Sequence, residues 1–465
     1  MKLYNTLTKK IEDFVPYNGK EVKLYTCGPT VYHYAHIGNL RTYICEDILE
    51  KSLNYLGYNV NRVMNITDVG HLSSDADTGE DKMLKGAKRE KKTVLEIAKY
   101  YTDCFKKDCE KLNIKWPDTV IPATSLIDEY IRFIKVLIEK EYAYLANGNI
   151  YFDTSKLKDY YQLTNHNEEE LMIGARDSVE EDTNKRNKTD FVLWFTKSKF
   201  EDQELKWDSP WGMGYPGWHI ECSCISLKYL GEELDIHCGG VDNIFPHHTN
   251  EIAQTESYLG KKWCNYWFHV EHLNDASGKM SKSSGEFLTV NLLEEKGYNP
   301  LAYRLFCLQS HYKNQLVFTY ESLDTAQNAY NKLVSKINSL KEDKAMIDKE
   351  AYEKYDSMFK DALADNLNTS NAITVLYDVL KSEISNGTKL ALIESFDKVL
   401  SLDLIKKEQT IDEDLLNYIN ESIEKRKEAK LNKDYELADN IRKELLDKGI
   451  ILKDTREGTT FEVTN

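Results

Sequence analysis

The chain has 465 residues and a net charge of −16, and 41% of its residues are hydrophobic while 30% are charged. This length and composition are typical of a soluble globular protein of two to four domains, and the lack of a membrane-length apolar run or a signal-like N-terminus excludes a membrane partner and predicts a cytoplasmic location. The acidic balance alone argues against a nucleic-acid partner, but local patches rather than global charge decide such binding.

The first predicted elements form a strand–helix–strand unit. Apolar Val22 and Leu24 alternate along a strand that ends in the turn 27–29. Apolar positions at helical spacing follow, and Gly57 is a plausible C-cap of that helix. Residues 59–67 have the pattern of a second strand, so the unit predicts a parallel sheet.

A polar, glycine-containing turn lies between the first strand and its helix. In open α/β sheets, ligands with phosphate groups bind at this place. His36 and Asn39 stand at the predicted start of the helix and could donate hydrogen bonds to phosphate oxygens. A lone histidine at such a position is more often structural, and both interpretations stay open from the pattern.

The middle of the chain interrupts the sheet. Lysine-rich residues 79–92 are predicted as a polar loop, and helical patterns follow at about 93–113 and 123–141. A turn then leads into a short apolar strand at 150–152. We interpret residues 117–205 as an insertion between two halves of the sheet domain.

The second half of the sheet domain is predicted from residue 206. It has a glycine-rich loop at 211–217, a helix at 218–231, a strand at 234–237, a helix at 246–259 and a strand at 266–270. Proline near the start and glycine after the end support the second of these helices.

The sequence pattern predicts that the C-terminal part is mostly helical. A small polar loop at 278–285 comes first, and residues 291–401 have the stripes of a helical bundle without convincing strands. A mostly polar linker at 404–410 leads to a long helical pattern at 411–447. A hairpin around 454–458 is predicted to close the chain.

Nine cysteines without a secretory signal indicate reduced thiols rather than a disulfide framework. His247 and Glu251 are spaced i, i+4 on a predicted helix and share one face. With Cys222 and Cys27 they offer the donor atoms of a tetrahedral zinc site. None of them belongs to a CxxC pair, so buried thiols and a surface His–Glu pair stay the alternative. Cys224 is a poor substitute for Cys222, because residues i and i+2 point to different sides of a helix.

Two lysines, Lys279 and Lys282, lie in a loop bounded by Gly278 and Gly285. One interpretation is a loop that closes on a triphosphate and stabilises the charge that develops there. The other is a solvated linker, which is the usual role of a lysine-rich loop.

Residues 36–39 and 279–283 together resemble the two signature motifs of the class I aminoacyl-tRNA synthetases. Asn39 departs from the first motif, which usually ends in histidine, and keeps a donor without a charge. Within that class, the chain is similar to the cysteinyl-tRNA synthetases along its catalytic domain and in its tail. The matching segments are 3–7, 25–32, 65–68, 217–223, 235–237, 245–248, 250–254, 433–434, 438–442, 449–450 and 454–455.

The resemblance implies a Rossmann-like, parallel-sheet α/β catalytic domain with an inserted connective module and an α-helical C-terminal half. The implied domains are the first catalytic half at 1–116, the inserted module at 117–205, the second catalytic half with the zinc site and the lysine loop at 206–290, a stem-contact and helical-bundle tRNA-binding domain at 291–401, and a small anticodon-region domain at 411–465.

The resemblance also implies one zinc ion per chain, with Cys27, Cys222, His247 and Glu251 as ligands. Zinc binds a thiolate far better than a hydroxyl, so it would separate cysteine from serine without an editing domain. Cys238 departs from the family pattern, which usually has glycine there.

The implied partners are L-cysteine, ATP with Mg²⁺ and a cysteine tRNA, and we expect a monomer. The implied catalytic residues are His36, Asn39, Lys279 and Lys282. ATP contacts are implied for Thr30, His33, His36, Gly38, Asn39, Lys279, Met280, Ser281, Lys282 and Ser283. Substrate contacts are implied for Gly28, for Thr67 at the carboxylate end, for Trp218 and His237 around the substrate, and for Asp242 at the ammonium group.

Three other functions share some of these features. An ATP-dependent ligase that joins cysteine to an amino sugar would have the same zinc pocket and loops, but it would not need the long helical region and tail. A non-catalytic RNA-binding paralogue would be expected to have lost ligands or loop lysines, and all are present. A nucleotidyltransferase would leave the zinc set and the tail unexplained.

Overall fold

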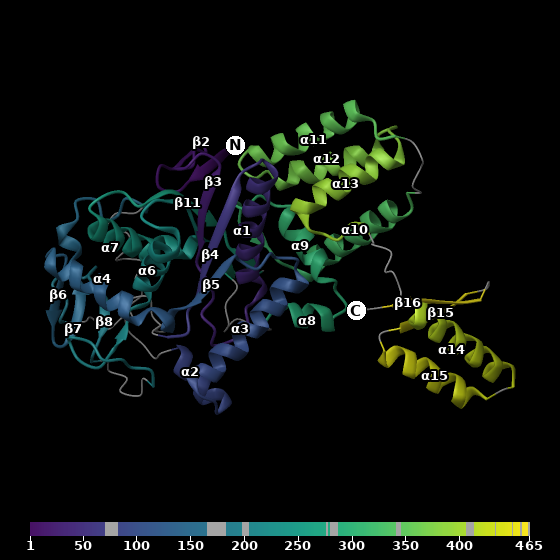
Figure 1. Ribbon diagram of the computed structural model, residues 1–465, viewed down its shortest axis with the longest axis horizontal. Helices are drawn as coiled ribbons and strands as arrows, with labels where there is room; N and C mark the ends of the chain where they lie inside the picture. Colours follow the sequence, from purple (N-terminus) through teal and green to yellow (C-terminus); the bar gives the residue numbers. More distant parts are fainter. Residues whose placement is uncertain are drawn as a thin grey trace. The chain divides into compact units, whose positions relative to one another are not determined.

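The computed structural model falls into two compact units, Met1–Ile405 and Lys406–Asn465, each described by itself (Figure 1). The residues that the structure describes are 1–69, 82–164, 183–197, 204–275, 278–279, 287–340, 346–405, 413–432, 434–448, 450–455 and 458–463.

The first unit is built on a five-stranded parallel sheet in the order β11-β10-β3-β4-β5. Its strands are β3 (Glu21–Thr26), β4 (Asn59–Ile66), β5 (Thr119–Pro122), β10 (Leu234–Gly240) and β11 (Cys264–Val270). All neighbouring strands pair in parallel, which confirms the predicted Rossmann-like sheet. In the sheet, β4 lies on one side of β3 and β10 lies on the other side. The strand order therefore reverses at β3, and ligands bind at such a switch point.

Helices cover both faces of this sheet, as Figure 1 shows. On one side α4 (Ile127–Glu139), α6 (Trp218–Leu230) and α7 (Thr249–Leu259) pack together. On the other side lies α1 (Ile37–Tyr55), which begins at an N-cap where His36 accepts a hydrogen bond from the Asn39 amide. Helix α7 starts three residues after the predicted start at Pro246, and the segment Ile244–His248 before it is kinked at Phe245, whose backbone is extended (φ −138°, ψ 132°).

Three strands of the predicted insertion and a fourth strand that follows it, β9, form an antiparallel sheet in the order β6-β7-β8-β9. Its strands are β6 (Ala143–Ala146), β7 (Asn149–Phe152), β8 (Phe191–Phe195) and β9 (Tyr215–Pro216). The strand β5 lies within the range predicted for the insertion, yet it pairs with β4 in the central sheet. The predicted domain boundaries themselves stay predictions.

Part of the predicted lysine-rich loop at 79–92 is helical, so this prediction was wrong over residues 82–90. Helix α2 (Lys82–Glu90) buries Met83, Leu84 and Ala87, and it packs against α3 (Val94–Lys111). The reason is amphipathic spacing: a few apolar side chains on one face suffice to dock a helix whose other face is charged.

The region after the sheet is mostly helical, as predicted. It comprises α8 (Val290–Glu295), α9 (Pro300–Leu308), α10 (Tyr320–Asn338), α11 (Lys349–Ala364), α12 (Thr369–Lys381) and α13 (Asn386–Leu400). A short strand was not predicted: β14 (Leu316–Val317) pairs with β12 (Leu273–Asp275), which also pairs with β13 (Gly278–Lys279). Two residues of pairing are too few to leave a strand signal in the sequence.

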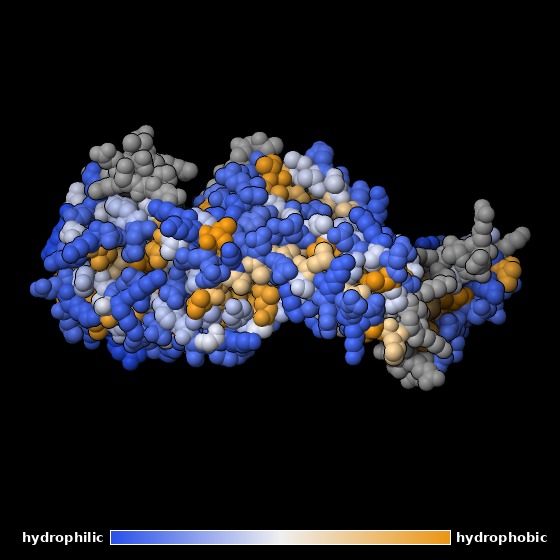
Figure 2. Space-filling model, turned by 90° about the horizontal axis from the view of Figure 1, so that it is seen from above, coloured by the Kyte–Doolittle hydropathy of each residue, from blue (hydrophilic) through white to orange (hydrophobic). Residues whose placement is uncertain are grey.

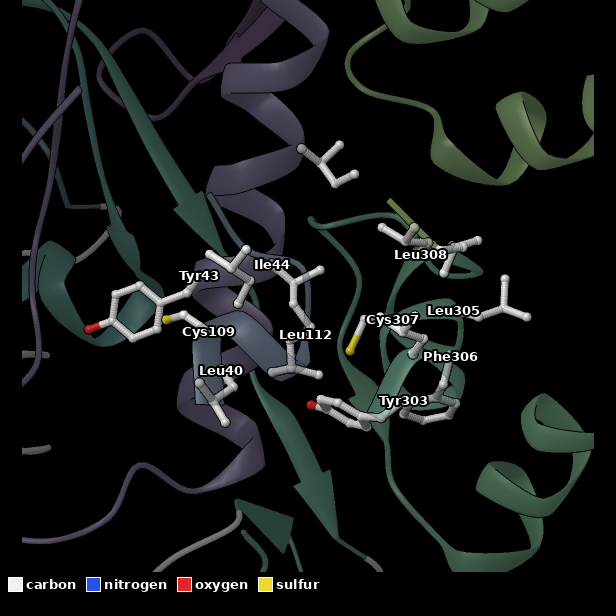
Figure 3. Close-up of a cluster of buried hydrophobic side chains, with 14 of the residues drawn as sticks. Leu40, Tyr43, Ile44, Cys109, Leu112, Tyr303, Leu305, Phe306, Cys307 and Leu308 are labelled. Atoms are coloured by element: carbon white, nitrogen blue, oxygen red, sulfur yellow. The ribbon is translucent and has the colours of Figure 1, made fainter. Parts of the chain in front are cut away.

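The helical region shares one hydrophobic core with the sheet domain. Figure 3 shows Tyr43 and Ile44 of α1 close to Cys109 of α3, with Leu112 just beyond and Tyr303 of α9 on the far side. Helix α9 is therefore anchored on α1, the helix that carries the first signature motif.

At the N-terminus, β1 (Lys2–Asn5) and β2 (Lys10–Asp13) form a hairpin. The second unit contains α14 (Glu413–Leu431), α15 (Tyr435–Asp447) and the antiparallel pair β15 (Ile450–Thr455) and β16 (Gly458–Val463). The predicted terminal hairpin is confirmed.

The single long helical pattern at 411–447 corresponds to two helices, which corrects the prediction. Asp434 caps the second helix, α15, by accepting a hydrogen bond from the Leu437 amide at 3.0 Å. Helical periodicity on both sides of the break hides it from a pattern analysis.

The face seen in Figure 2 is mostly hydrophilic, and its hydrophobic side chains lie in small separate groups. None of the helices in the described ranges is long and apolar enough to cross a membrane.

Charged side chains are buried beneath α1. The Asp47 carboxylate accepts from the Arg304 guanidinium at 2.6 Å, and both side chains are fully buried. Lys51 is 2.8 Å from the same carboxylate. Removing one partner of such a pair leaves an uncompensated charge in the interior.

Asp47→Ala should therefore lower the free energy of unfolding of the first unit by about 3–5 kcal/mol, measured by urea denaturation. Glu294→Ala is the matched control, because Glu294 pairs with Lys111 at a partly exposed position and such pairs contribute at most about 1 kcal/mol. Equal losses in the two variants would contradict the buried-pair interpretation.

Candidate active site and metal centre

A cavity of about 370 Å³ opens at the carboxyl ends of β3 and β10, beside the N-terminus of α1. Its walls come from the turn after β3, from the first turn of α1, from α6 and from the segments that follow β10 and β11. The predicted site residues that line it are Cys27, Gly28, Thr30, His33, His36, Gly38, Asn39, Thr67, Trp218, Cys222, Asp242 and His247.

The four side chains with metal-ligand character come together at the inner end of this cavity. Cys27 follows β3, Cys222 lies in α6, His247 lies in the kinked segment before α7, and Glu251 lies in α7. One donor atom from each lies within 4.8 Å of the others, and three of the four residues are buried. The arrangement can hold a metal ion.

Glu251 is the carboxylate of this cluster and is fully buried. Its Oε2 atom is 2.8 Å from Nε2 of His237, and its Oε1 atom is 3.0 Å from Nε2 of His247. Burial opposes its ionisation, but the charges of His237 and His247 outweigh burial and lower the pKa of Glu251 to about 2. The same Oε1 atom lies 3.9 Å from Nε2 of His248, so three imidazole rings surround this carboxylate.

The two thiols of the cluster differ in proton affinity. Their sulfur atoms are 3.9 Å apart. Burial raises the pKa of Cys27 well above its usual range. For Cys222, the hydrogen bond with Cys27 and the charge of His247 outweigh the opposing burial and lower the pKa to about 6. A metal ion that takes both sulfurs as thiolates displaces the protons that they carry.

The imidazole of His247 is oriented by its neighbours. The Trp218 indole stacks on it with ring centroids 4.0 Å apart and an interplanar angle of 6°. Its Nδ1 atom lies 2.9 Å from Nδ1 of His219, which leaves Nε2 to face the cluster. Such contacts behind a ligand fix the ring orientation and the tautomer.

A second set of side chains meets the same geometric condition, namely Cys27, His237, His248 and Glu251. The Nε2 atom of His248 is 3.3 Å from the Cys27 sulfur, and its Nδ1 atom is 2.8 Å from Nε2 of His269. Burial, and after it the neighbouring histidines, lower the pKa of His248 well below its usual range.

Sequence reasoning missed His219, His248 and His269. In the sequence, His248 follows His247 and His219 follows Trp218. This adjacency was a signal, because imidazole side chains next to predicted site residues often orient a metal ligand. His269 gave no such signal, since it reaches the site only through the pairing of β10 with β11.

Buried hydrogen bonds occupy the wall beside Thr67. Its hydroxyl donates to Glu221 at 2.8 Å and accepts from the Asn65 amide at 2.9 Å. Asn65 in turn accepts from the backbone N–H of Gly28 at 2.7 Å. The Thr67 proton is thus engaged with Glu221, a residue that the sequence did not reveal, and the predicted contact of Thr67 with a substrate carboxylate stays a prediction.

Gly28 allows the closest approach in the site. A Cβ atom at this position would lie 1.6 Å from the carbonyl oxygen of Asn65. No side chain fits between the two strand ends, so glycine here is a requirement of the fold.

The opposite wall is polar. Asp242 follows β10, and one of its oxygens is 3.3 Å from Nε2 of His272. Both residues line the cavity. Asp242 can accept a hydrogen bond from an ammonium group, and that predicted role stays a prediction.

The nucleotide side of the cavity is formed by the first signature motif. His36 caps α1, and a Cβ atom on Gly38 would lie 2.9 Å from its Nδ1 atom. His33 stacks on Tyr101 with an interplanar angle of 6°, and the edge of Phe287 lies against it at 4.5 Å between centroids. These rings and the helix N-terminus offer a surface for a nucleotide.

Lys279 lies in β13, and β13 pairs with β12. The first residue of β12, Leu273, lines the cavity. The other predicted residues of this loop, Met280, Ser281, Lys282 and Ser283, lie outside the described residues.

Comparison with known proteins places these observations in a family. The sequence profile of the class I (C) tRNA synthetase catalytic domain matches residues 13–328. A cysteine–tRNA ligase of Treponema denticola is 47% identical over 99% of this chain and 99% of its own length. A cysteine–tRNA ligase of Borrelia hermsii is 47% identical over 99% of this chain and 98% of its own length.

The fold has a solved relative. Methionyl-tRNA synthetase of Mycobacterium tuberculosis, in complex with methionyl-adenylate, is similar with a TM-score of 0.56. The match covers 82% of this chain and 91% of that chain at 16% sequence identity, so it concerns the fold alone.

Cys222→Ser removes one sulfur from the four-residue set, so its affinity for Co²⁺, a probe of thiolate metal sites, should fall by at least about 100-fold. The measurement is a titration followed by the thiolate-to-cobalt charge-transfer absorption.

Cys224→Ser is the matched control, because Cys224 lies in the same helix and is buried among hydrophobic side chains outside the cluster. It should bind Co²⁺ as the unaltered protein does. If Cys222→Ser binds normally while His248→Ala does not, the alternative set with His237 and His248 holds the metal instead.

Proposed function

We infer the mechanism of this protein from the family to which it belongs. It is a member of the class I tRNA synthetases and, within them, of the cysteine–tRNA ligases. Its activity is the ATP-dependent joining of cysteine to tRNA. The observation that carries the finer proposal is the meeting of two thiols, an imidazole and a carboxylate at one end of the cavity.

We propose that Cys27, Cys222, His247 and Glu251 hold one zinc ion per chain. Two thiolates, one imidazole and one carboxylate are typical zinc donors, and one donor atom from each of the four residues lies within 4.8 Å of the others. A bound zinc ion supplies a soft Lewis acid that prefers a thiolate to a hydroxyl. That preference would separate cysteine from serine, which a pocket of fixed size does poorly.

The side chains around this centre have supporting roles in the proposal. His237 holds Glu251 at 2.8 Å and acts through it, because His237 is fully buried. Trp218 keeps the His247 ring in place by stacking and closes the cavity over the amino acid. Asp242 would accept from the substrate ammonium group, and Gly28 and Thr67 would lie along its remaining atoms.

In the first proposed step, a cysteine carboxylate oxygen attacks the α-phosphorus of ATP, and pyrophosphate leaves. The protein supplies no nucleophile, so positioning and charge stabilisation do the catalysis. His36 and Asn39 at the N-terminus of α1 would hold the nucleotide with Thr30, His33 and Gly38. Lys279 and Lys282 would close from the other side, with Mg²⁺ on the triphosphate.

In the second proposed step, a ribose hydroxyl at the 3′ end of a cysteine tRNA attacks the carbonyl carbon of the adenylate, and AMP leaves. We propose that the helices within 291–401 support the tRNA stem and that the region 411–465 reads the anticodon. A monomer and a cytoplasmic location stay the expectations from the sequence.

The test is cysteine-dependent ATP–pyrophosphate exchange with serine as the control, followed by acylation of a cysteine tRNA transcript. We expect exchange with cysteine, little with serine, and acylation of the transcript. Exchange without acylation would favour the amino-sugar ligase. No exchange in zinc-replete protein would contradict the proposal.

Lys282→Ala should slow adenylate formation by about 10²–10³-fold, because a cation aimed at developing phosphate charge contributes that much. Single-turnover adenylation measures the rate, and equilibrium binding of cysteine should change little. Lys349→Ala, at the exposed start of α11, is the control and should leave both unchanged. An unchanged rate in Lys282→Ala would refute the role of the loop.

A further inference from the structure

Arg41 in α1 is fully buried, and its surroundings differ from those of the other buried arginines. Two other arginines of the first unit are equally buried, and both pair with carboxylates: Arg62 with Glu46 and Glu50, and Arg304 with Asp47. Among the described residues, Arg41 forms no ion pair with a carboxylate. A buried cation without a counterion is costly, so its retention calls for a reason.

The two terminal nitrogen atoms of the Arg41 guanidinium donate hydrogen bonds to backbone carbonyl groups. Its Nη1 atom donates to the carbonyl oxygen of Glu271 at 2.7 Å and to that of His272 at 2.5 Å. Its Nη2 atom donates to the carbonyl oxygen of Asn314 at 2.6 Å and, at 3.5 Å, to that of His311. Its Nε atom is buried and has no hydrogen-bond partner within the described part of the chain.

Two of these carbonyl groups, those of Glu271 and His272, belong to residues that line the cavity. Glu271, His272 and Leu273 line the cavity, and β12 begins at Leu273. That strand pairs on one side with β13, which contains Lys279, and on the other side with β14, just after Asn314. The Leu316 amide also donates to the His272 carbonyl at 3.0 Å. One side chain of α1 therefore binds the backbone just before each strand of the parallel β12–β14 pair.

Arg41 also lies two residues from Asn39, which lines the cavity, and next to Thr42, which lines it as well. The helix turn that presents the first motif is thus bound directly to the strands that lead into the second motif. A planar guanidinium fixes several acceptors in one geometry, whereas a lysine ammonium does not.

We propose that Arg41 is a positioning residue, which sets the separation between the N-terminal turn of α1 and the cavity wall that contains Glu271 and His272, and so places the ATP phosphates at that turn. It touches neither substrate nor metal, and it acts through the backbone of Glu271, His272 and Asn314. The proposal rests on the adenylate-forming activity proposed above. Because misplacement by about 1 Å can cost about 100-fold in rate, the effect should appear in kcat.

The test compares Arg41→Lys with Arg304→Lys in the full-length, zinc-loaded protein. Both substitutions keep a buried cation and remove a guanidinium fork, but Arg304 bonds to Asp47 and to the carbonyl groups of Leu400 and Leu112, none of which lines the cavity. The measurements are the melting temperature and the kcat and KM values of cysteine-dependent ATP–pyrophosphate exchange, taken where circular dichroism shows each variant folded.

We expect Arg41→Lys to lower kcat by about 10- to 100-fold, with KM for cysteine within twofold of the unaltered protein. Arg304→Lys should lower the melting temperature and keep kcat within twofold. The unaltered protein reports on the proposed function by itself, so a lack of exchange there is distinct from a failure of the Arg41 proposal.

Two results would overturn the proposal: an unchanged kcat in Arg41→Lys, or losses of kcat in both variants that follow their losses of melting temperature. Arg41→Gln, which keeps two N–H donors, replaces Arg41→Lys if the latter does not fold. Failure of both variants to fold would also overturn it, because Arg41 would then be needed for the fold itself.

Discussion

The parallel pairing of β3 with β10 is the constraint on which the site depends. It aligns Tyr25 with His237 and brings the Cys27 amide to the carbonyl oxygen of Cys238 at 3.2 Å, although some 210 residues separate the strands in sequence. The two strand ends then open a switch point, and every potential metal ligand reaches the site from an element that starts or ends there. The proposed metal centre and the proposed nucleotide-binding surface therefore lie at the same opening in the sheet.

The interior under α1 is unusually polar for a core. Glu46, Asp47 and Glu50 are buried on the same helix that presents the first signature motif, and Arg62 and Arg304 neutralise them from β4 and α9. Buried ion pairs add little net stability, but they are strict about geometry because a wrong partner leaves a charge unpaired. They fix the middle of α1, beyond the turn that presents the first signature motif, to the sheet and to the helical region.

The sequence predicted what depends on local pattern and on motifs. The parallel sheet followed from alternating strands around a helix, and the i, i+4 spacing predicted a shared face for His247 and Glu251. The spacing alone could not bring Cys27 and Cys222 to that face, because only the sheet order does so. Asn65, Glu221, His248 and His269 were missed for the same reason, because they act through contacts between elements that lie far apart in the sequence. Helix α2 was missed because its many lysines hid three apolar side chains on one face.

The shared core of sheet and helices determines where the gene can be divided. A cut near residue 290 would strip α9 from α1 and expose Tyr303, Leu305 and their neighbours to water (Figure 3). A cut after Ile405 would leave the whole of the first unit intact. The natural junction is therefore the one after Ile405 and not the one near residue 290. This holds for the expression of a minimal fragment and for a fusion to a foreign RNA-binding module.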